Sequence, residues 1–311
     1  MHLPRSPLAA LALFVLLAAG LAGCGLGAGE RDTNARVLVT RDFGTRELGA
    51  RIVQDAPSSE TVLRLLERNF DVETRYGGGF VQSIEGVSGG REDGDPVDWF
   101  FFVNGVESEV GAGEVDVHEG DRVWWDHRNW GASGHVPAVV GSYPEPFAHG
   151  AEGKRYPLVL ECADDVEQAC DTVSERLGTL GAIPARRALG TGVGDRTLRV
   201  VVGTWGDLRE DQTLELIDRG PAQSGVYARF GEAGRLLELL GDDGKPMRAL
   251  GAGAGLVAAT RFEDGAPTWT VTGTDAAGVE AAARALTERR LQRRYAVALD
   301  GPRAIGLPVV R

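Results

Sequence analysis

The stretch Trp99-Phe100-Phe101-Phe102-Val103-Asn104-Gly105-Val106 decides the fold of the first half of this 311-residue chain. Aromatic and β-branched side chains favour a β-strand, and the dipeptide Asn104-Gly105 accepts positive φ at both central positions of a tight turn. The segment therefore predicts a strand that runs into a β-hairpin. Because alternate residues of a strand point to opposite faces of a sheet, both faces of this strand carry aromatic side chains.

The sequence around this hairpin predicts a small sheet with one helix. Short β-rich runs occupy residues 37–40 and 51–54, and apolar residues then repeat at helical spacing from Val62 to Leu66. Two more strands are expected at residues 80–84 and 121–127. We assign residues 35–130 to one domain.

Several of these segments, taken in order, resemble a known family. They are the helix at 61–66, the glycine loop at 77–80, the segment 83–87, the hairpin at 99–105 and the segment 120–124. Together they resemble the domain-of-unknown-function 4430 (DUF4430) module, over about residues 36–130. That module is similar to the C-terminal domain of transcobalamin and intrinsic factor and to soluble-ligand-binding β-grasp domains.

The resemblance implies a β-grasp-like fold and a lineage in which one group of members closes over cobalamin. In the vitamin carriers a large helical barrel forms the other half of the site, and nothing in this sequence resembles that barrel. Cobalamin is therefore one ligand to consider, and no cofactor is predicted.

The second aromatic face of the sheet has two alternative partners. A single helix covers only one face, so the other face meets either the second domain or a flat apolar ligand. Burial is the commoner fate of aromatic side chains. For the ligand alternative, the predicted binding residues are Tyr76, Phe80, Trp99, Phe100, Phe102, Trp124 and Trp130.

Residues 155–311 predict a second domain with a mixed sheet. Three times an apolar strand leads through a polar turn to a helix, and the helices are expected at 166–177, 208–217 and 276–294. The predicted fold class is α+β: a β-grasp-like domain followed by a mixed-sheet α/β domain. Residues 131–154, which contain several prolines, are a packed connector or a flap over the aromatic face.

The first 23 residues are organised as an export signal. Arg5 precedes an uncharged run from Leu8 to Ala22, and Leu21-Ala22-Gly23 comes directly before Cys24. This order resembles the bacterial lipobox, which implies that Cys24 carries a lipid. The apolar run has 15 residues, whereas a membrane span needs about 20. An uncleaved anchor and a secreted protein with an incidental Cys24 are the alternatives.

A lipid on Cys24 would place the protein at the cell membrane, on its extracytoplasmic face. Residues 24–34 are rich in glycine and predict a flexible tether. Export to an oxidising compartment favours a disulfide between the two remaining cysteines, Cys162 and Cys170. A metal or redox pair would more often have two intervening residues.

Charge and motif content narrow the function further. The formal net charge is −12, and loss of residues 1–23 would make it more negative because they contain one arginine and no acid. Nucleic acid and anionic lipid surfaces are repelled by such a chain. No nucleophile motif marks a catalytic residue. The histidines at 118, 127, 135 and 149 match no metal-ligand spacing, so they are expected to be solvated and no metal is predicted.

The sequence thus predicts a membrane-tethered lipoprotein that binds a small ligand through its aromatic β-grasp face and delivers it to a transporter. The alternative is an envelope module that docks on a protein or wall polymer and has no small-molecule pocket. A hydrolase is the least favoured reading.

Overall fold

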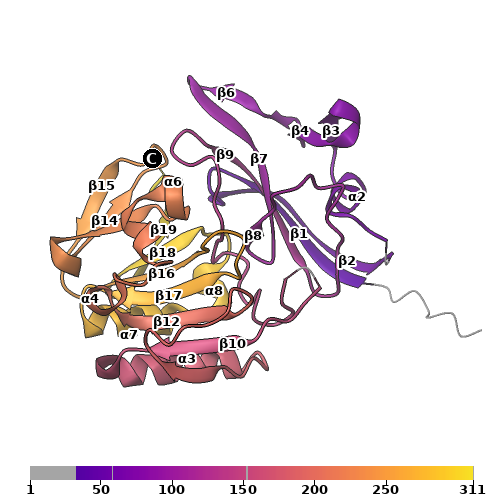
Figure 1. Cartoon of the computed structure of the whole chain (residues 1–311). Helices are drawn as coiled ribbons and strands as arrows, with labels where there is room; N and C mark the ends of the chain where they lie inside the picture. Colours follow the sequence, from indigo (N-terminus) through magenta and orange to yellow (C-terminus); the bar gives the residue numbers. More distant parts are fainter. Residues whose placement is uncertain (1–32, 58, 152, 311) are drawn as a thin grey trace, which may run out of the picture.

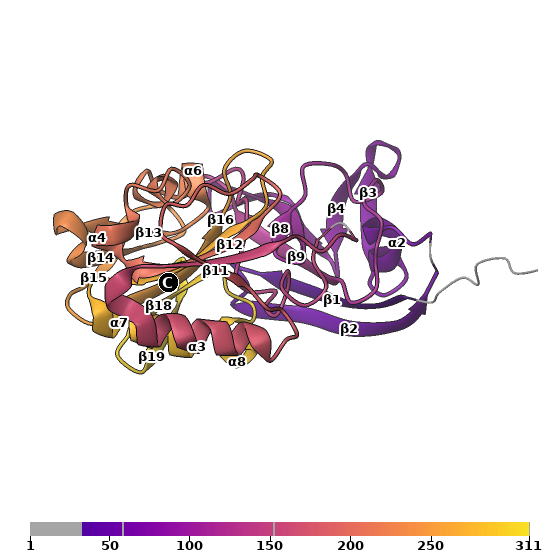
Figure 2. The ribbon, with the colours of Figure 1, turned by 60° about the horizontal axis from the view of Figure 1, so that its bottom comes forward.

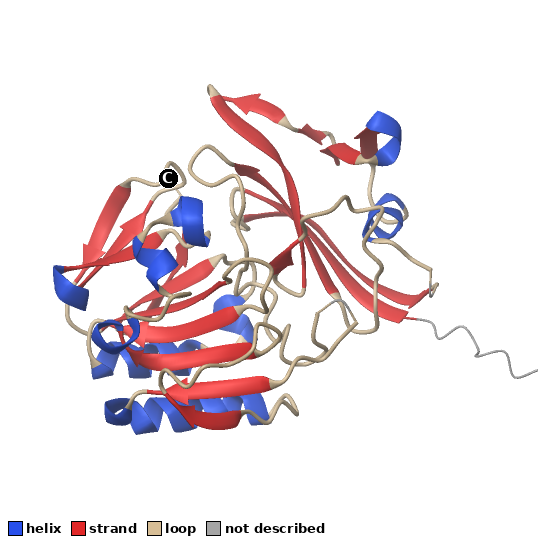
Figure 3. Cartoon of the chain, in the orientation of Figure 1, coloured by secondary structure: helices blue, strands red, loops and turns tan. Residues whose placement is uncertain are grey.

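The computed structural model describes residues 33–57, 59–151 and 153–310, which form two domains packed side by side (Figure 1). The first domain is drawn in indigo and purple, and the second runs from pink through orange to yellow. Strands predominate in both, with helices around them (Figure 3). The predicted α+β class is confirmed. Residues 1–23, Cys24 and all but the last two residues of the predicted tether lie outside the described residues.

The first domain is built on a mixed sheet whose strands follow the order β2-β1-β9-β7-β6, with β8 paired to β7. Strand β1 runs parallel to β9 at the centre, and the other pairs are antiparallel. The strands are β1 (Thr33–Arg41), β2 (Arg46–Ala56), β6 (Gly90–Glu92), β7 (Asp95–Val103), β8 (Val106–Glu107) and β9 (Arg122–Asn129). This pattern is the β-grasp-like arrangement that the sequence predicts.

The turn between β7 and β8 is the one expected from its sequence. Asn104 and Gly105 have φ values of 53° and 82°, as a turn with two left-handed positions requires. The prediction of a hairpin is confirmed.

One helix and a small second sheet cover one face of the first domain. The helix α2 (Val62–Glu67) is capped by the side chain of Thr61, which accepts a hydrogen bond from the backbone N–H of Arg64. Its buried Val62, Leu65 and Leu66 pack in one core with Trp99 and Phe101. The small sheet contains β3 (Val72–Arg75), β4 (Phe80–Ile84) and β5 (Val87–Ser88), with the 3-10 turn η1 (Tyr76–Gly78) after β3.

The second domain contains a seven-stranded mixed sheet in the order β11-β10-β12-β17-β16-β18-β19. The first four strands of this order are parallel and the last three antiparallel to their neighbours. The strands are β10 (Leu158–Cys162), β11 (Ala185–Ala188), β12 (Leu198–Thr204), β16 (Ala254–Thr260), β17 (Thr268–Gly273), β18 (Ala296–Asp300) and β19 (Arg303–Leu307).

Different elements cover the two faces of this sheet (Figure 2). On one face lie η2 (Asp164–Val166), α3 (Glu167–Gly178), α7 (Ala276–Ala285) and α8 (Glu288–Leu291). On the other lie α4 (Trp205–Leu208), α5 (Glu215–Asp218), α6 (Pro221–Ser224), η3 (Glu232–Gly234) and the antiparallel strands β13 (Ala228–Gly231), β14 (Leu236–Leu240) and β15 (Pro246–Leu250).

Two of the three expected helices are shorter than the sequence predicts. The segment 208–217 is not one helix, since α4 ends at Leu208 and α5 begins at Glu215. Helix α7 starts as expected, with the Asp275 side chain accepting from the N–H of Gly278, but it ends at Ala285 because Leu286 has a ψ of 72°. A separate turn, α8, then precedes β18.

The predicted disulfide is present. Cys162 at the end of β10 is bonded to Cys170 in α3, with 6.1 Å between their Cα atoms. The bond joins a strand to the helix that follows it.

The connector between the domains is packed. Val136 and Val139 are at most 1% exposed and share a core with Phe102 and Trp124 of the first domain. Tyr143 continues into the core beneath α3 and α7. Of the two alternatives for residues 131–154, the structure therefore has the packed connector, which lies on the aromatic face. Among the described residues no helix combines the length and apolar character needed to cross a membrane.

Candidate functional site

The aromatic strand β7 divides its side chains between two cores. Trp99 and Phe101 enter the core beneath α2, whereas Phe102 enters a core shared with the second domain. Phe100 is half-buried, and the guanidinium of Arg128 lies over its ring at 3.8 Å. The alternation follows from the period of a strand. It separates residues that the sequence groups into one surface.

The second aromatic face meets the second domain. The ring of Tyr295 contacts Trp124 at 5.4 Å and Phe102 at 5.5 Å between centroids. Phe43 lies between Tyr295 and Tyr227, at 5.2 Å and 5.3 Å. These five rings are each less than 6% exposed. The first of the two alternatives for this face, burial against the second domain, is the one observed.

A buried carboxylate sits beside these rings. Asp126 of β9 is fully buried and accepts hydrogen bonds from the hydroxyl groups of Thr40, at 2.5 Å, and Tyr295, at 2.9 Å. Burial raises the pKa of Asp126 to about 6, and the hydrogen bonds and the charge of Arg128 only partly oppose this rise. Burial likewise raises the pKa of Tyr295 well above its ordinary value.

A second polar group in the interface centres on Arg128, which is 1% exposed. Its guanidinium donates to Glu107 at 3.3 Å and to the carbonyl oxygen of Ser133 at 2.7 Å. Glu107 also bonds Nδ1 of His135 at 3.0 Å and accepts from the N–H of Val136 at 2.9 Å. A buried charge needs such partners. This network holds the connector against β8 and β9.

The histidines occupy different environments. His127 is 2% exposed, its ring lies tilted against that of Trp99 with 5.2 Å between centroids, and it bonds the carbonyl oxygen of Ser88. The expectation that it is solvated is wrong, because β9 extends beyond it and its ring lies beneath β5. Burial lowers its pKa. His149 bonds Glu145 at 2.6 Å. Within the described ranges no three His, Cys, Asp or Glu side chains are grouped as metal ligands would be.

The seven predicted ligand-binding residues are not in one place. Trp99, Phe102 and Trp124 are between 0 and 6% exposed in the two cores. Phe102 contacts no ligand unless the domains separate, whereas Trp124 lines a groove beside β1. Tyr76 is 87% and Phe80 36% exposed, and their rings pair at 6.5 Å at the tip of the β3–β4 hairpin. Trp130, at 41%, follows β9 separately.

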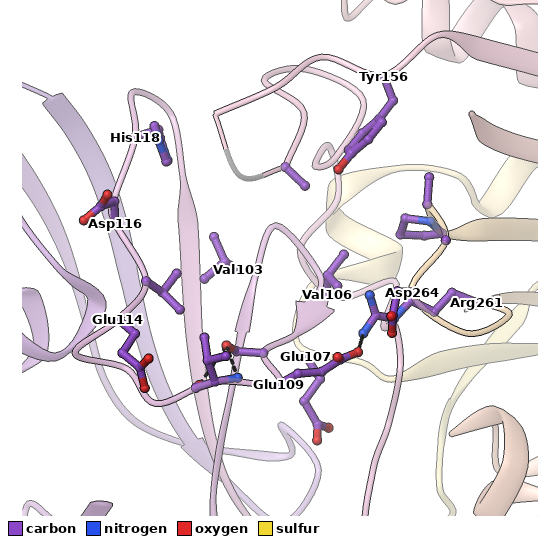
Figure 4. A pocket seen from close by; sticks show the side chains of 17 residues that line it. Val103, Val106, Glu107, Glu109, Glu114, Asp116, His118, Tyr156, Arg261 and Asp264 are labelled. Atoms are coloured by element: carbon purple, nitrogen blue, oxygen red, sulfur yellow. Dashed lines mark hydrogen bonds and ion pairs between the residues drawn. The ribbon is translucent and has the colours of Figure 1, made fainter. Parts of the chain in front are cut away.

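A cleft of about 530 Å³ opens where the two domains meet (Figure 4). We call it the interdomain cleft. The first domain contributes the end of β7, β8 and the loop 108–118, and the second contributes Tyr156 and the loop 261–267 between β16 and β17. Val103 and Val106 lie between Glu114 and Asp116 on one side and Arg261 and Asp264 on the other. The cleft is lined by Val103, Val106, Glu107, Ser108, Glu109, Val110, Glu114, Val115, Asp116, His118, Ala151, Tyr156, Arg261, Asp264, Gly265, Ala266 and Pro267.

The charges of the interdomain cleft are only partly balanced. Glu109 forms an ion pair with Arg261, whose side chain is 10% exposed and whose Nε has no partner among the described residues. Glu114, Asp116 and Asp264 are exposed, and none of them has an ion pair or side-chain hydrogen bond with another described residue. The arrangement is an apolar floor with a surplus of negative charge at its rim.

These cleft residues are absent from the sequence prediction. They come from two loops and a two-residue strand that lie far apart in the chain, so no spacing pattern connects them. The one available signal is the exposed Val110 beside Glu109 in the loop that follows the hairpin.

The matches to solved structures cover about a third of the chain. No curated protein matches this chain at a significant level. Among solved structures, a protein of Ruminococcus gnavus ATCC 29149, described as a candidate metal-binding protein, is 15% identical with a TM-score of 0.25, covering 32% of this chain and 98% of its own. Haptocorrin in complex with Cbi is 16% identical with a TM-score of 0.26, and the match covers 32% of this chain and 26% of haptocorrin.

The family comparison is more specific. Residues 59–129 match the family model described as Domain of unknown function (DUF4430). The matched segment runs from just before α2 to the last residue of β9 and contains the aromatic strand β7. Residues 59–129 of this chain are therefore similar to the DUF4430 family.

Proposed function

We propose that this protein binds a small, positively charged amphiphile in the interdomain cleft, and that it does so as a lipid-anchored protein outside the cytoplasmic membrane. The observation that carries the binding proposal is the unequal pairing of charges in the cleft. Arg261 balances Glu109, whereas three further carboxylates, on Glu114, Asp116 and Asp264, form no ion pair with another residue that the structure describes.

Charge and shape together favour an amine or quaternary ammonium with an apolar body. The unbalanced carboxylates attract a cation to the rim, and Val103 and Val106 offer an apolar floor on which the rest of the ligand lies. The cleft volume of about 530 Å³ is within the usual range for small-molecule sites. A corrinoid, with its macrocycle and nucleotide loop, would project well beyond it, so cobalamin serves as a comparison ligand.

In this proposal the predicted aromatic residues take two roles. Phe102 and Trp124 act indirectly, because they hold the two walls of the cleft together. Tyr76 and Phe80 lie at a hairpin tip next to the cleft loop, since an added Cβ at Gly111 would be 3.5 Å from the carbonyl oxygen of Gly79. They are placed to contact a ligand that extends out of the cleft.

Calorimetric titration with decyltrimethylammonium, below its micelle concentration, tests the proposal. We expect saturable binding that is weakened about tenfold in the triple variant Glu114→Gln, Asp116→Asn, Asp264→Asn, since each exposed charge contact contributes up to about 1 kcal/mol. Glu263→Gln is the matched control, because this residue is adjacent to Asp264 but does not line the cleft. Equal binding by the triple variant and the unmodified protein would refute the cleft as the site.

The anchor is tested separately. The proposal holds that Cys24 is acylated and that the protein delivers its ligand to a membrane transporter. Mass spectrometry of the N-terminal peptide from membrane-bound protein should find a diacylglyceryl cysteine at residue 24, and Cys24→Ala should release the protein from the membrane. An unmodified Cys24 in membrane-bound protein would contradict the anchor and leave the cleft experiment unaffected.

One observation favours a second candidate, an envelope module that docks on another protein. Tyr76 is 87% exposed and pairs with Phe80 at a projecting hairpin tip, and exposed aromatic residues are common anchors of interfaces. Cross-linking in intact cells should then recover one dominant partner, and Tyr76→Ser should abolish it. If Tyr76→Ser gives the same cross-linking pattern as the unmodified protein, the hairpin tip is excluded as the docking surface.

A further inference from the structure

Part of the aromatic sheet face is left uncovered by the second domain. In the register of the sheet Leu38 of β1 pairs with Trp124 on one side and with Ala50 on the other, and Arg36 pairs with Ile52. Paired residues lie on the same face. Trp124 is covered by Tyr295, but Leu38 is only half-buried and Ile52 is 70% exposed. The β1–β2 edge of this face is therefore open.

A groove of about 510 Å³ lies along this open edge, and we call it the basic groove. It is distinct from the interdomain cleft and shares no lining residue with it. Its apolar part is formed by Leu38, Ala50, Ile52 and Trp124, and its wall by Gly141, Ser142, Glu288, Gln292 and Arg293.

The charge at this groove is opposite in sign to that of the chain. Arg122 pairs with Glu288 at 2.6 Å, Arg293 pairs with Glu47 at 2.8 Å, and Arg36 reaches Glu288 only at 3.8 Å. Three guanidinium groups thus share two carboxylates, in a protein whose net charge is −12. Since the Debye length is about 8 Å at physiological salt, the local sign decides what binds here.

Hydrogen-bond donors at the groove also lack partners. The side-chain hydrogen bonds that Arg122 and Arg293 form with described residues all run through Nη1, although a guanidinium has five N–H donors. Ser142, which lines the groove, is 3% exposed, and its Oγ has no hydrogen-bond partner among the described residues. This Oγ is itself inaccessible to solvent, so the donors open to a ligand are the remaining N–H groups of Arg122 and Arg293, whose side chains are partly exposed.

We propose that the basic groove binds an anionic amphiphile. Its carboxylate or phosphate head is held by Arg36 and Arg293, with Arg122 behind them, and its apolar tail lies over Leu38, Ala50 and Ile52. Guanidinium groups suit this head because they donate two parallel hydrogen bonds to an oxyanion. The open apolar face supplies the tail with a surface that is otherwise exposed to water.

Calorimetric titration with dodecyl phosphate, below its micelle concentration, tests this site in the chain from residue 25 onward, which contains every described residue. We expect saturable binding, with affinity at least about tenfold above that for inorganic phosphate, which lacks the tail, and for dodecyl maltoside, which lacks the charge. The double variant Arg36→Gln, Arg293→Gln should bind dodecyl phosphate about tenfold more weakly, as expected for the loss of one charged hydrogen bond. Arg122 is left unchanged because it also supports the carbonyl oxygen of Tyr143.

Two matched variants separate the contributions. Arg209→Gln removes an arginine that lines neither site and should bind as the unmodified protein does. Ile52→Ser removes an exposed apolar side chain. It should weaken the binding of dodecyl phosphate and leave the binding of inorganic phosphate unchanged. If dodecyl maltoside binds as tightly as dodecyl phosphate, the requirement for charge is overturned. If inorganic phosphate binds as tightly as dodecyl phosphate, the role of the tail is overturned. If dodecyl phosphate shows no saturable binding, the site itself is overturned.

A final arm distinguishes the sources of such a ligand. Co-sedimentation with phosphatidylglycerol vesicles that is lost in the double variant supports the site and identifies a membrane lipid as the source. Saturable dodecyl phosphate binding without co-sedimentation supports the site and identifies a soluble amphiphile.

Discussion

The phenol of Tyr295 donates a hydrogen bond of 2.9 Å to Oδ2 of Asp126, and so connects the second domain to the central strand pair of the first. The two residues are 169 positions apart in the chain. The other carboxylate oxygen of Asp126 accepts from Thr40 and from the N–H of Gly44. A single buried carboxylate therefore joins three separate segments.

The first prediction concerns the pH dependence of stability. Because burial raises the folded-state pKa of Asp126 to about 6, the native state holds this proton at pH values where the unfolded state has lost it. Ionisation of Asp126 therefore lowers the stability of the folded protein as the pH rises from about 4 to about 7. We expect the free energy of unfolding, relative to that of Asp126→Asn, to fall on the order of 3 kcal/mol across this range.

Chemical denaturation of both proteins at several pH values provides the measurement. Asp93→Asn, at an exposed turn residue, is the control. Its free energy of unfolding should change with pH in the same way as that of the unmodified protein. A constant difference between Asp126→Asn and the unmodified protein from pH 4 to 7 would show that Asp126 is not protonated in the folded state.

The second prediction concerns the hydroxyl group of Tyr295, which donates this hydrogen bond. Tyr295→Phe leaves Oδ2 of Asp126 without this partner in a site that water does not reach, so it should destabilise the protein by about 2 kcal/mol at pH 8. Tyr76→Phe, at a phenol that is 87% exposed, should change stability by less than about 0.5 kcal/mol. Urea denaturation compares the two, and equal effects would contradict the role assigned to this hydrogen bond.

The third prediction concerns Arg128. Arg128→Met keeps much of the side-chain volume but leaves Glu107 as a buried charge with fewer partners, which should cost about 3–5 kcal/mol. Adding Glu107→Gln should recover part of this loss, because the uncompensated charge is then gone. The result is measured as a double-mutant cycle in denaturant. Additive effects of the two substitutions would mean that the pair is not coupled.

The fourth prediction concerns the β7–β8 turn. Gly105 has a φ of 82°, and a Cβ there would meet the carbonyl oxygen of Val139 at 2.7 Å. Gly105→Ala should therefore lower the free energy of unfolding by more than about 1 kcal/mol. Gly134→Ala, where nothing lies within 4 Å of the added Cβ, is the comparison. A thermal melt that is equally shifted by both substitutions would disprove the steric argument.

The fifth prediction concerns the disulfide. Cys162 and Cys170 are separated by 8 positions, and a short closed loop of this kind stabilises the folded state by about 2.5 kcal/mol through the unfolded chain. Replacing both cysteines with alanine should cost about this amount in denaturation under oxidising conditions. The unmodified protein with reductant added should show the same loss, and a reductant-insensitive stability would argue against the bond.

Local patterns predicted the features that depend on nearby residues. The hairpin follows from Asn104-Gly105, the start of α7 from the capping side chain of Asp275, and the disulfide from a pair of cysteines in a chain that the sequence predicts to be exported. Each of these is determined within about ten residues of sequence. Such short-range preferences are strong when the chemistry is specific.

Features that depend on tertiary contacts were missed or misjudged. The helix expected over 276–294 stops at Ala285 because the next residues return to build β18 against β16. His127 gives no sequence signal of burial, yet β5 covers its ring. The cleft residues come from separate loops, and the partner of the aromatic face, Tyr295, lies almost at the end of the chain. No periodicity within a segment encodes such pairings.

The late position of Tyr295 has a consequence for how the protein is made. During synthesis the first domain emerges with Phe102 and Trp124 uncovered, and their partner ring is added only after nearly the whole second domain has been translated. Contacts of such sequence separation form slowly. The native interface between the two domains therefore cannot be completed until translation of the chain is almost finished.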